Sequence, residues 1–161
     1  MRRRFINQLI MKRNRKIDTI MVHCTATRAG REVSVAELDA WHKARNFEPY
    51  TEVRSGKRVY AGYHLLVHLD GSYERIRPDE ERGQHCTQAG MNNRAVSVCY
   101  VGGVDNNNKP CDTRTEAQKL TLVTLLKTLR AKYRDAQIVG HRDYAPKACP
   151  SFDAKMEYGE I

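Results

Sequence analysis

Two short runs of apolar and β-branched residues constrain the fold of this chain more than any other feature. Residues 18–26 read DTIMVHCTA and residues 95–102 read AVSVCYVG, with no charged residue after the first position of either run. Runs of this length and composition are typical of buried strands. A third apolar run, over 62–69, ends at Asp70-Gly71, a dipeptide that favours a tight hairpin turn into a further strand over 72–76.

Helix signals separate these strands. Ser34 and Glu37 form an S-x-x-E capping box, and Thr115 and Gln118 form a second box ahead of leucines at helical spacing. We also expect an irregular polar hairpin within 46–60, a surface loop over 77–91, a turn at 105–110, a strand over 137–139, an irregular segment over 141–150 and a brief terminal helix. This alternation, without any internal repeat, predicts an α/β single domain with a central mixed β-sheet flanked by helices.

The charge of the chain is concentrated at its N-terminus. The formal net charge is +9, and residues 1–16 hold seven basic side chains and no acidic one. The remainder has 21 basic against 19 acidic side chains, so we expect a basic N-terminal arm over 1–16 and a nearly neutral domain over 17–161. The arm is either solvated or in contact with an anionic polymer or surface.

The apolar runs and the cysteines of the chain indicate the compartment in which it is made. No apolar run approaches the roughly 20 residues of a membrane span, and the apolar stretch 5–11 is interrupted by Asn7 and Gln8, so we predict no signal peptide. Five cysteines, an odd count without a CxxC motif, argue for synthesis in a reducing cytoplasm. We interpret Cys24, Cys99 and Cys111 as small buried hydrophobes.

Metal-ligating side chains concentrate near strand ends. His23 lies near the end of the first run, and His141 and Cys149 lie eight residues apart in the segment that follows the strand over 137–139. Imidazole and thiolate together suit zinc, and three protein ligands leave a fourth position for water. On its own, His23 also fits a hydrogen-bonded core histidine.

Two further histidines are poor candidates for the same ion. His64 and His68 are four residues apart in an expected strand, a spacing of about 13 Å that prevents chelation of one ion. His42, next to Trp41 on the first expected helix, is interpreted as structural.

Several motifs in a fixed order resemble one family. They are VHCTAT at 22–27, WHK at 41–43, GYH at 62–64, VCYVGG at 98–103, GH at 140–141 and APKACPSFD at 145–153. Together they resemble the zinc-dependent N-acetylmuramoyl-L-alanine amidases of type 2, a superfamily that includes T-odd phage lysozyme and the animal peptidoglycan recognition proteins. The resemblance spans residues 17–153. The chain departs from the phage pattern in its arm, in a longer connection between Trp41 and Gly62 and in the loop over 83–88.

The resemblance implies a function and a site. The zinc ligands would be His23, His141 and Cys149, and the catalytic residues would be Tyr63 and Lys147. The implied reaction is attack of zinc-activated water on the amide that joins N-acetylmuramic acid to L-alanine of the stem peptide. Tyr63 would orient groups rather than abstract a proton, because an unshifted phenol is a poor base at neutral pH.

The implied partner is bacterial peptidoglycan, bound through its muropeptide stem by a monomer that is released from the cytoplasm to the cell wall. Arg77, Arg82 and Arg94 are either contacts for a diaminopimelate carboxylate or solvated charges. The alternatives are a non-catalytic peptidoglycan-binding module, disfavoured because Cys149 is present, and a nucleic-acid- or polymerase-binding regulator. The nearly neutral domain, which lacks a helix-turn-helix pattern, disfavours the latter, and we expect no nucleic acid partner.

Overall fold

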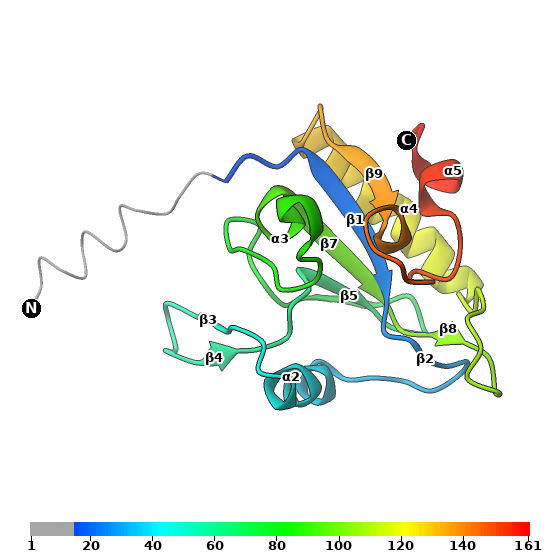
Figure 1. The fold of residues 1–161 in the computed structure, drawn as a ribbon, viewed down its shortest axis with the longest axis horizontal. Coiled ribbons are helices and arrows are strands. Elements are labelled where there is room, and N and C mark those ends of the chain that lie inside the picture. Colours follow the sequence, from blue (N-terminus) through cyan, green and yellow to red (C-terminus); the bar gives the residue numbers. More distant parts are fainter. Residues whose placement is uncertain (1–14) are drawn as a thin grey trace, which may run out of the picture.

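A mixed five-stranded sheet lies at the centre of the structure, a computed structural model that describes residues 15–161 (Figure 1). In spatial order its strands are β6 (Tyr73–Arg75), β5 (Leu65–Val67), β7 (Ala95–Tyr100), β1 (Thr19–Cys24) and β9 (Gln137–Gly140). The edge strand β6 is antiparallel to β5, and the other neighbouring pairs are parallel. The central mixed sheet predicted from the sequence is confirmed.

The two apolar runs form the innermost strands. Every residue of β1 and β7 is buried, because each strand has a neighbour on both sides and a covered surface on both faces. Two small ribbons flank the sheet: β2 (Thr27–Arg28) pairs with β8 (Gly103–Val104), and β3 (Tyr50–Thr51) pairs with β4 (Arg58–Val59). The second ribbon is the hairpin expected within 46–60.

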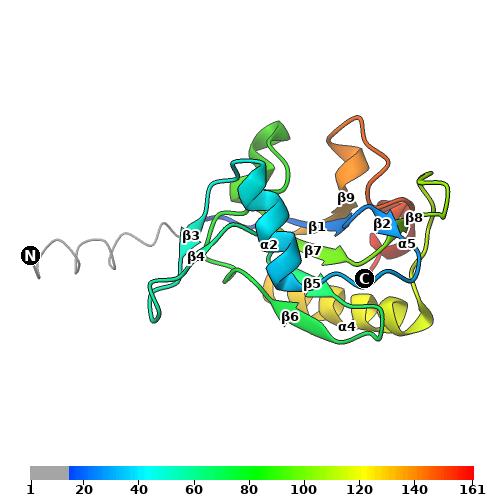
Figure 2. The same cartoon turned by 90° about the horizontal axis from the view of Figure 1, so that it is seen from below.

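One face of the sheet is covered by α4 (Glu116–Lys132), with α5 (Ala154–Tyr158) packed near β9 (Figure 2). The helix begins at the predicted capping box, where Gln118 N–H donates to Thr115 Oγ1 and Thr115 N–H donates to Gln118 Oε1. Leu122 and Leu126 are fully buried in the main core, as their helical spacing predicted.

The opposite face carries α2 (Val35–Ala44) and two long loops, one over 77–94 and one over 141–150 (Figure 2). The first loop ends in the short helices η1 (Gln88–Gly90) and α3 (Met91–Arg94), and the second begins with η2 (His141–Asp143). Side chains alternate between the faces of a strand. Val22 and Cys24 belong to the α4-side core, so His23 points toward the loops.

The N-terminal arm expected over 1–16 lies mostly outside the described residues. Arg15, however, is bound to the domain: its guanidinium donates to the carbonyl oxygens of Asp79 at 2.6 Å, Asn93 at 3.0 Å and Ala95 at 3.0 Å. Burial lowers the pKa of Arg15. Within 15–161, no helix combines the length and apolar character that a membrane span needs.

All five cysteines are free thiols. Cys24 and Cys99 are buried, as interpreted from the sequence. The same interpretation is wrong for Cys111, which is exposed because it lies in the connection between β8 and α4.

Candidate metal centre

The parallel pairing of β1 with β9 brings two histidines together. In the register of these strands Val22 lies opposite Gly140, and the next residues of the two segments are His23 and His141. Their ring centroids are 4.6 Å apart, and both side chains are buried. The site therefore lies at the carboxyl ends of neighbouring parallel strands, where sheets of this kind place their ligands.

The loop that follows β9 returns Cys149 to the same place. Gly140 N–H donates to Asp143 Oδ2 at 2.7 Å, which fixes the start of the loop. Arg142 N–H donates to the carbonyl oxygen of Cys149 at 2.8 Å, which ties the end of the loop to its start. A Cβ at position 140 would lie 2.8 Å from Pro150 Cδ. Glycine at this position allows the returning limb to pass close to the strand.

Three donor atoms converge as a result. The ligand atoms of His23, His141 and Cys149 all lie within 4.8 Å of one another, and no other described residues form such a group. Cys149 Sγ is 3.7 Å from His23 Nδ1 and accepts a hydrogen bond from Cys24 N–H at 3.3 Å. Two imidazoles and a thiolate are the donor chemistry that zinc prefers, with one coordination position left open.

The protonation states suit a ligand set. Burial, together with the charge of Lys147, lowers the pKa of His141 to about 4, and burial lowers the pKa of His23 well below its usual value. Both rings are therefore neutral at neutral pH, with lone pairs available. A hydrogen bond with the Cys24 thiol, reinforced by burial, raises the pKa of Cys149, so metal binding has to displace its proton.

Both residues assigned to catalysis by resemblance lie at this centre. The Tyr63 ring centroid is 5.0 Å from that of His23, and burial raises the pKa of the phenol well above its usual value. Lys147 is exposed in the returning loop, and its charge contributes to the lowered pKa of both His23 and His141. A protonated phenol and a cation therefore stand beside the proposed ligands.

Three other histidines are engaged elsewhere. His42 Nδ1 accepts a hydrogen bond from Gly62 N–H at 2.9 Å, consistent with the structural role expected for it. His64 is fully buried, with Nδ1 2.9 Å from Ser97 Oγ, and His68 lies between two glutamates, Glu32 and Glu74. None of the three belongs to the converging group.

Sequence reasoning missed His85. Its Nδ1 lies 3.1 Å from His23 Nε2, so it touches a proposed ligand on the side away from Cys149. It comes from the loop over 83–88, where no periodic pattern or metal-ligand spacing marks it. The only available signal was its residue type, since it is the fifth of the six histidines of the chain.

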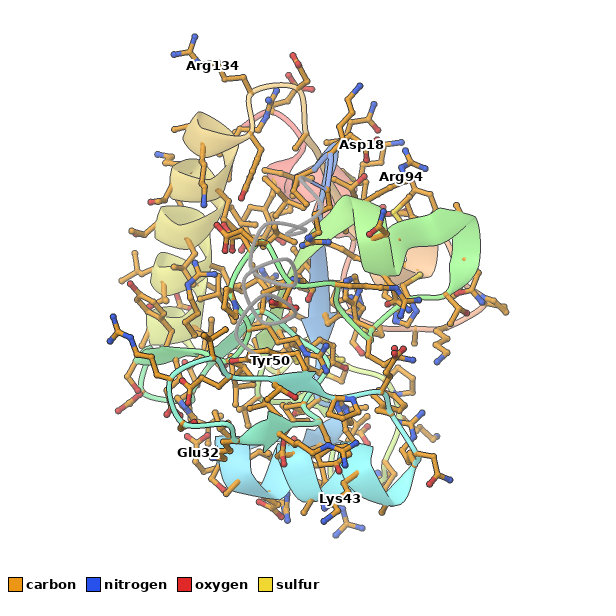
Figure 3. The ribbon with its side chains drawn as sticks, turned by 90° about the vertical axis from the view of Figure 1, so that its left-hand side faces the viewer. Asp18, Glu32, Lys43, Tyr50, Arg94 and Arg134 are labelled. Carbon is orange, nitrogen blue, oxygen red and sulfur yellow. The ribbon has the colours of Figure 1, made fainter. Side chains whose placement is uncertain are left out.

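The arginines singled out in the sequence have mixed outcomes. Arg77 is 3% exposed and donates to the carbonyl oxygens of Ala61 at 2.7 Å and Glu48 at 3.0 Å. Both expectations for Arg77 are therefore wrong, because its guanidinium is occupied in holding backbone. Arg94 pairs with Asp18 at 2.9 Å, and the two residues lie near each other in Figure 3.

Comparison with known families gives one match that covers most of the chain. Residues 13–152 match the family model described as N-acetylmuramoyl-L-alanine amidase. The endolysin of Escherichia phage T7 is 38% identical over 144 residues, which cover 89% of this chain and 87% of the relative. The endolysin of Klebsiella phage KP32 is 39% identical over 136 residues, covering 84% and 82%.

Solved structures share the fold. The amidase LysC from Clostridium intestinale superposes with a TM-score of 0.66 at 25% identity, covering 88% of this chain and 81% of that one. The peptidoglycan recognition protein SA of Drosophila superposes with a TM-score of 0.65 at 18% identity, covering 91% and 80%. At that lower identity the likeness concerns the fold alone.

Proposed function

This chain belongs to the N-acetylmuramoyl-L-alanine amidase family, and from that premise we propose that His23, His141 and Cys149 hold the zinc ion of its active site. The activity itself follows from the family and its relatives. The protein is a peptidoglycan hydrolase that cleaves the amide between N-acetylmuramic acid and L-alanine of the stem peptide.

One observation carries the zinc proposal. Two neutral imidazoles and a thiol, from two strand ends and one returning loop, present ligand atoms within 4.8 Å of one another. When bound, zinc supplies a Lewis acid that polarises a carbonyl and lowers the pKa of water to about 7. The Cys24 N–H that donates to Cys149 Sγ stabilises negative charge on that sulfur.

We assign Tyr63 and Lys147 to the reacting amide. The phenol of Tyr63 remains protonated at neutral pH because its pKa is raised, so it donates a hydrogen bond rather than acting as a base. The ammonium of Lys147 places positive charge where the tetrahedral oxyanion develops. Loss of one such donor typically costs about 10²–10³ in rate.

The substrate in this proposal is the muropeptide stem of bacterial peptidoglycan, reached at the cell wall after synthesis in the cytoplasm. The curated relatives that support it are endolysins. We further propose that the enzyme acts as a monomer, because all the assigned ligands and catalytic side chains come from one chain.

The decisive experiment identifies the bond that is cut. Purified cell walls are digested, and free L-alanine amino termini and new reducing sugar ends are both counted. We expect amino termini to appear and reducing ends to stay at background. A chelator should abolish the reaction, and added zinc should restore it.

Two results would contradict this proposal in different ways. Reducing ends at a yield comparable with amino termini would mean that a glycosidic bond is cut, which needs a pair of carboxylates rather than this donor set. Unchanged release of amino termini from protein shown to be free of metal would overturn the zinc assignment and leave the amidase activity standing.

A further inference from the structure

The histidine that sequence reasoning missed has an unusual pair of contacts. The two rings of His85 and His23 meet edge to face, with centroids 4.9 Å apart and 79° between their planes, and His85 Nδ1 lies 3.1 Å from His23 Nε2. The other nitrogen of His85, Nε2, is buried and has no hydrogen-bond partner among the described residues. Among the described residues, the one hydrogen bond of this ring is therefore with a proposed metal ligand.

This arrangement differs from that of an ordinary core histidine. His64, on the same side of the sheet, has both ring nitrogens within hydrogen-bond distance of partners, including Ser97 Oγ and the carbonyl oxygen of Glu81. A buried nitrogen without a partner costs about 1–3 kcal/mol, so it calls for an explanation. Packing alone does not supply one, since His64 shows that the region can satisfy a buried imidazole.

The loop holds His85 in place. Its backbone N–H donates to Asn92 Oδ1 at 2.6 Å, and the N–H of Cys86 donates to the same oxygen at 2.8 Å. A Cβ at Gly83 would lie 2.4 Å from His85 Cδ2 and 2.8 Å from its Nε2. Glycine at position 83 thus makes room for the ring, and the surrounding contacts leave it little freedom to turn away.

Tautomer chemistry connects these contacts to the metal. His23 presents Nδ1 to the side of Cys149, 3.7 Å from its sulfur. If Nδ1 gives its lone pair to a metal, the proton of the neutral ring is on Nε2, which then donates to His85 Nδ1. Ligating histidines almost always donate their second N–H in this way, usually to a carboxylate, a carbonyl or water.

We propose that His85 is a positioning residue of the metal centre, which accepts the Nε2–H of His23 and thereby keeps Nδ1 directed at the ion. The inference rests on the proposed zinc site. A neutral imidazole in this place orients His23 without adding a negative charge, so the ion keeps more of its positive charge than it would beside a carboxylate.

Zinc affinity is the direct test, measured by competition with a chromogenic chelator at fixed pH. His85→Leu fills a similar volume without an acceptor and should weaken zinc binding about 10–100-fold. His85→Asn places an amide oxygen near the position of Nδ1 and should recover most of that loss. His68→Ala, which removes a histidine outside the converging group, should bind zinc as the wild type does.

Each outcome has a defined meaning. Wild-type affinity in folded His85→Leu, or an Asn variant as weak as the Leu variant, overturns the inference while leaving the zinc site intact. A wild-type chain that binds no zinc overturns the site and the inference with it.

A second measurement needs no variant. Nitrogen-15 spectra of histidine-labelled, zinc-loaded wild-type protein should show the proton of His23 on Nε2. A proton on His23 Nδ1 would overturn the inference even if His85→Leu fails to fold.

Discussion

At the scale of single residues, the histidines of this chain differ in what their ring nitrogens contact. His42 and His64 are buried like His23, yet His42 Nδ1 accepts from a backbone amide, and both nitrogens of His64 lie at hydrogen-bond distance from hydroxyl or carbonyl groups. His23 and His141 leave nitrogens facing the sulfur of Cys149. Burial alone therefore does not identify a ligand; the direction of the remaining lone pair does.

The first expected outcome at this scale concerns the sulfur ligand. Cys149→Ser should lower zinc affinity by at least about 100-fold, because loss of a ligand costs more than loss of an outer hydrogen-bond partner. The measurement is zinc content after dialysis against a mild chelator. Cys111→Ser changes an exposed thiol and is the matched control. Full zinc occupancy in Cys149→Ser would show that the ligand set is misassigned.

Tyr63 and Lys147 should behave in the opposite way. Tyr63→Phe and Lys147→Ala should keep zinc, since neither side chain belongs to the converging group. Each should lose about 10²–10³ in the rate of wall hydrolysis if it donates to the developing oxyanion. Rates and zinc content are measured on the same preparations. A variant with the wild-type rate would show that the replaced residue has only a structural role.

At the scale of elements, the loop over 77–94 is tied to the end of α4 by one buried carboxylate. The Asp79 side chain is 4% exposed and accepts hydrogen bonds from Lys132 and Tyr133, both at 2.8 Å. Burial alone would raise the pKa of Asp79. The bonds from Lys132 and Tyr133, together with the charge of Arg75, outweigh burial and lower this pKa to about 2.

This lowered pKa predicts a pH dependence of stability. A carboxyl group with a pKa of 3.8 when unfolded and about 2 when folded stabilises the fold by about 2 kcal/mol above pH 4. That contribution is lost as the pH falls from about 4 toward 2. Asp79→Asn should have a lower free energy of unfolding at pH 7. Its free energy of unfolding should also lack the part of the decrease between pH 4 and pH 2 that comes from protonation of Asp79.

Urea denaturation at a series of pH values measures the effect. Asp135→Asn, at an exposed aspartate beyond the end of α4, is the control and should follow the wild-type curve. If the free energy of unfolding falls equally for the wild type and Asp79→Asn between pH 4 and 2, Asp79 is not the source of the pH dependence.

Local elements could be predicted from the sequence, whereas contacts between distant elements could not. The start of α4 at Thr115 was predictable, because a capping box links residues three apart and leaves its signature in the sequence. The contacts of Asp79 with Lys132 and of His85 with His23 join residues 53 and 62 positions apart. No local pattern encodes such pairs, so a surface loop was predicted over 77–91, and the structural and site roles of this segment were missed.

At the scale of the whole molecule, the sheet order makes the site. β1 lies between β7 and β9, so a histidine near the start of the chain meets a thiol 126 positions later. The apolar runs predicted the strands, and the resemblance supplied the ligand identities. Strand order and register come from long-range packing, which the sequence patterns do not report.

The last expected outcome concerns where the domain begins. Arg15 joins the start of the described chain to the loop over 77–94 and to β7, through carbonyl oxygens of Asp79, Asn93 and Ala95. Arg15→Leu removes the donors and leaves the partly buried carbonyl oxygens of Asp79 and Ala95 unpaired, at about 1–3 kcal/mol for each group that water cannot reach. We therefore propose that the domain begins at or before residue 15, rather than at 17.

Urea denaturation tests this boundary. Arg15→Leu should lower the free energy of unfolding by at least about 2 kcal/mol, given several acceptors at that cost each. Arg15→Lys should recover only part of the loss, since an ammonium lacks the planar fork that reaches separate carbonyls together. Lys16→Ala, at the exposed neighbouring position, should leave stability unchanged. If Arg15→Leu and Lys16→Ala have the same free energy of unfolding, Arg15 belongs to the arm, and the boundary at 17 stands.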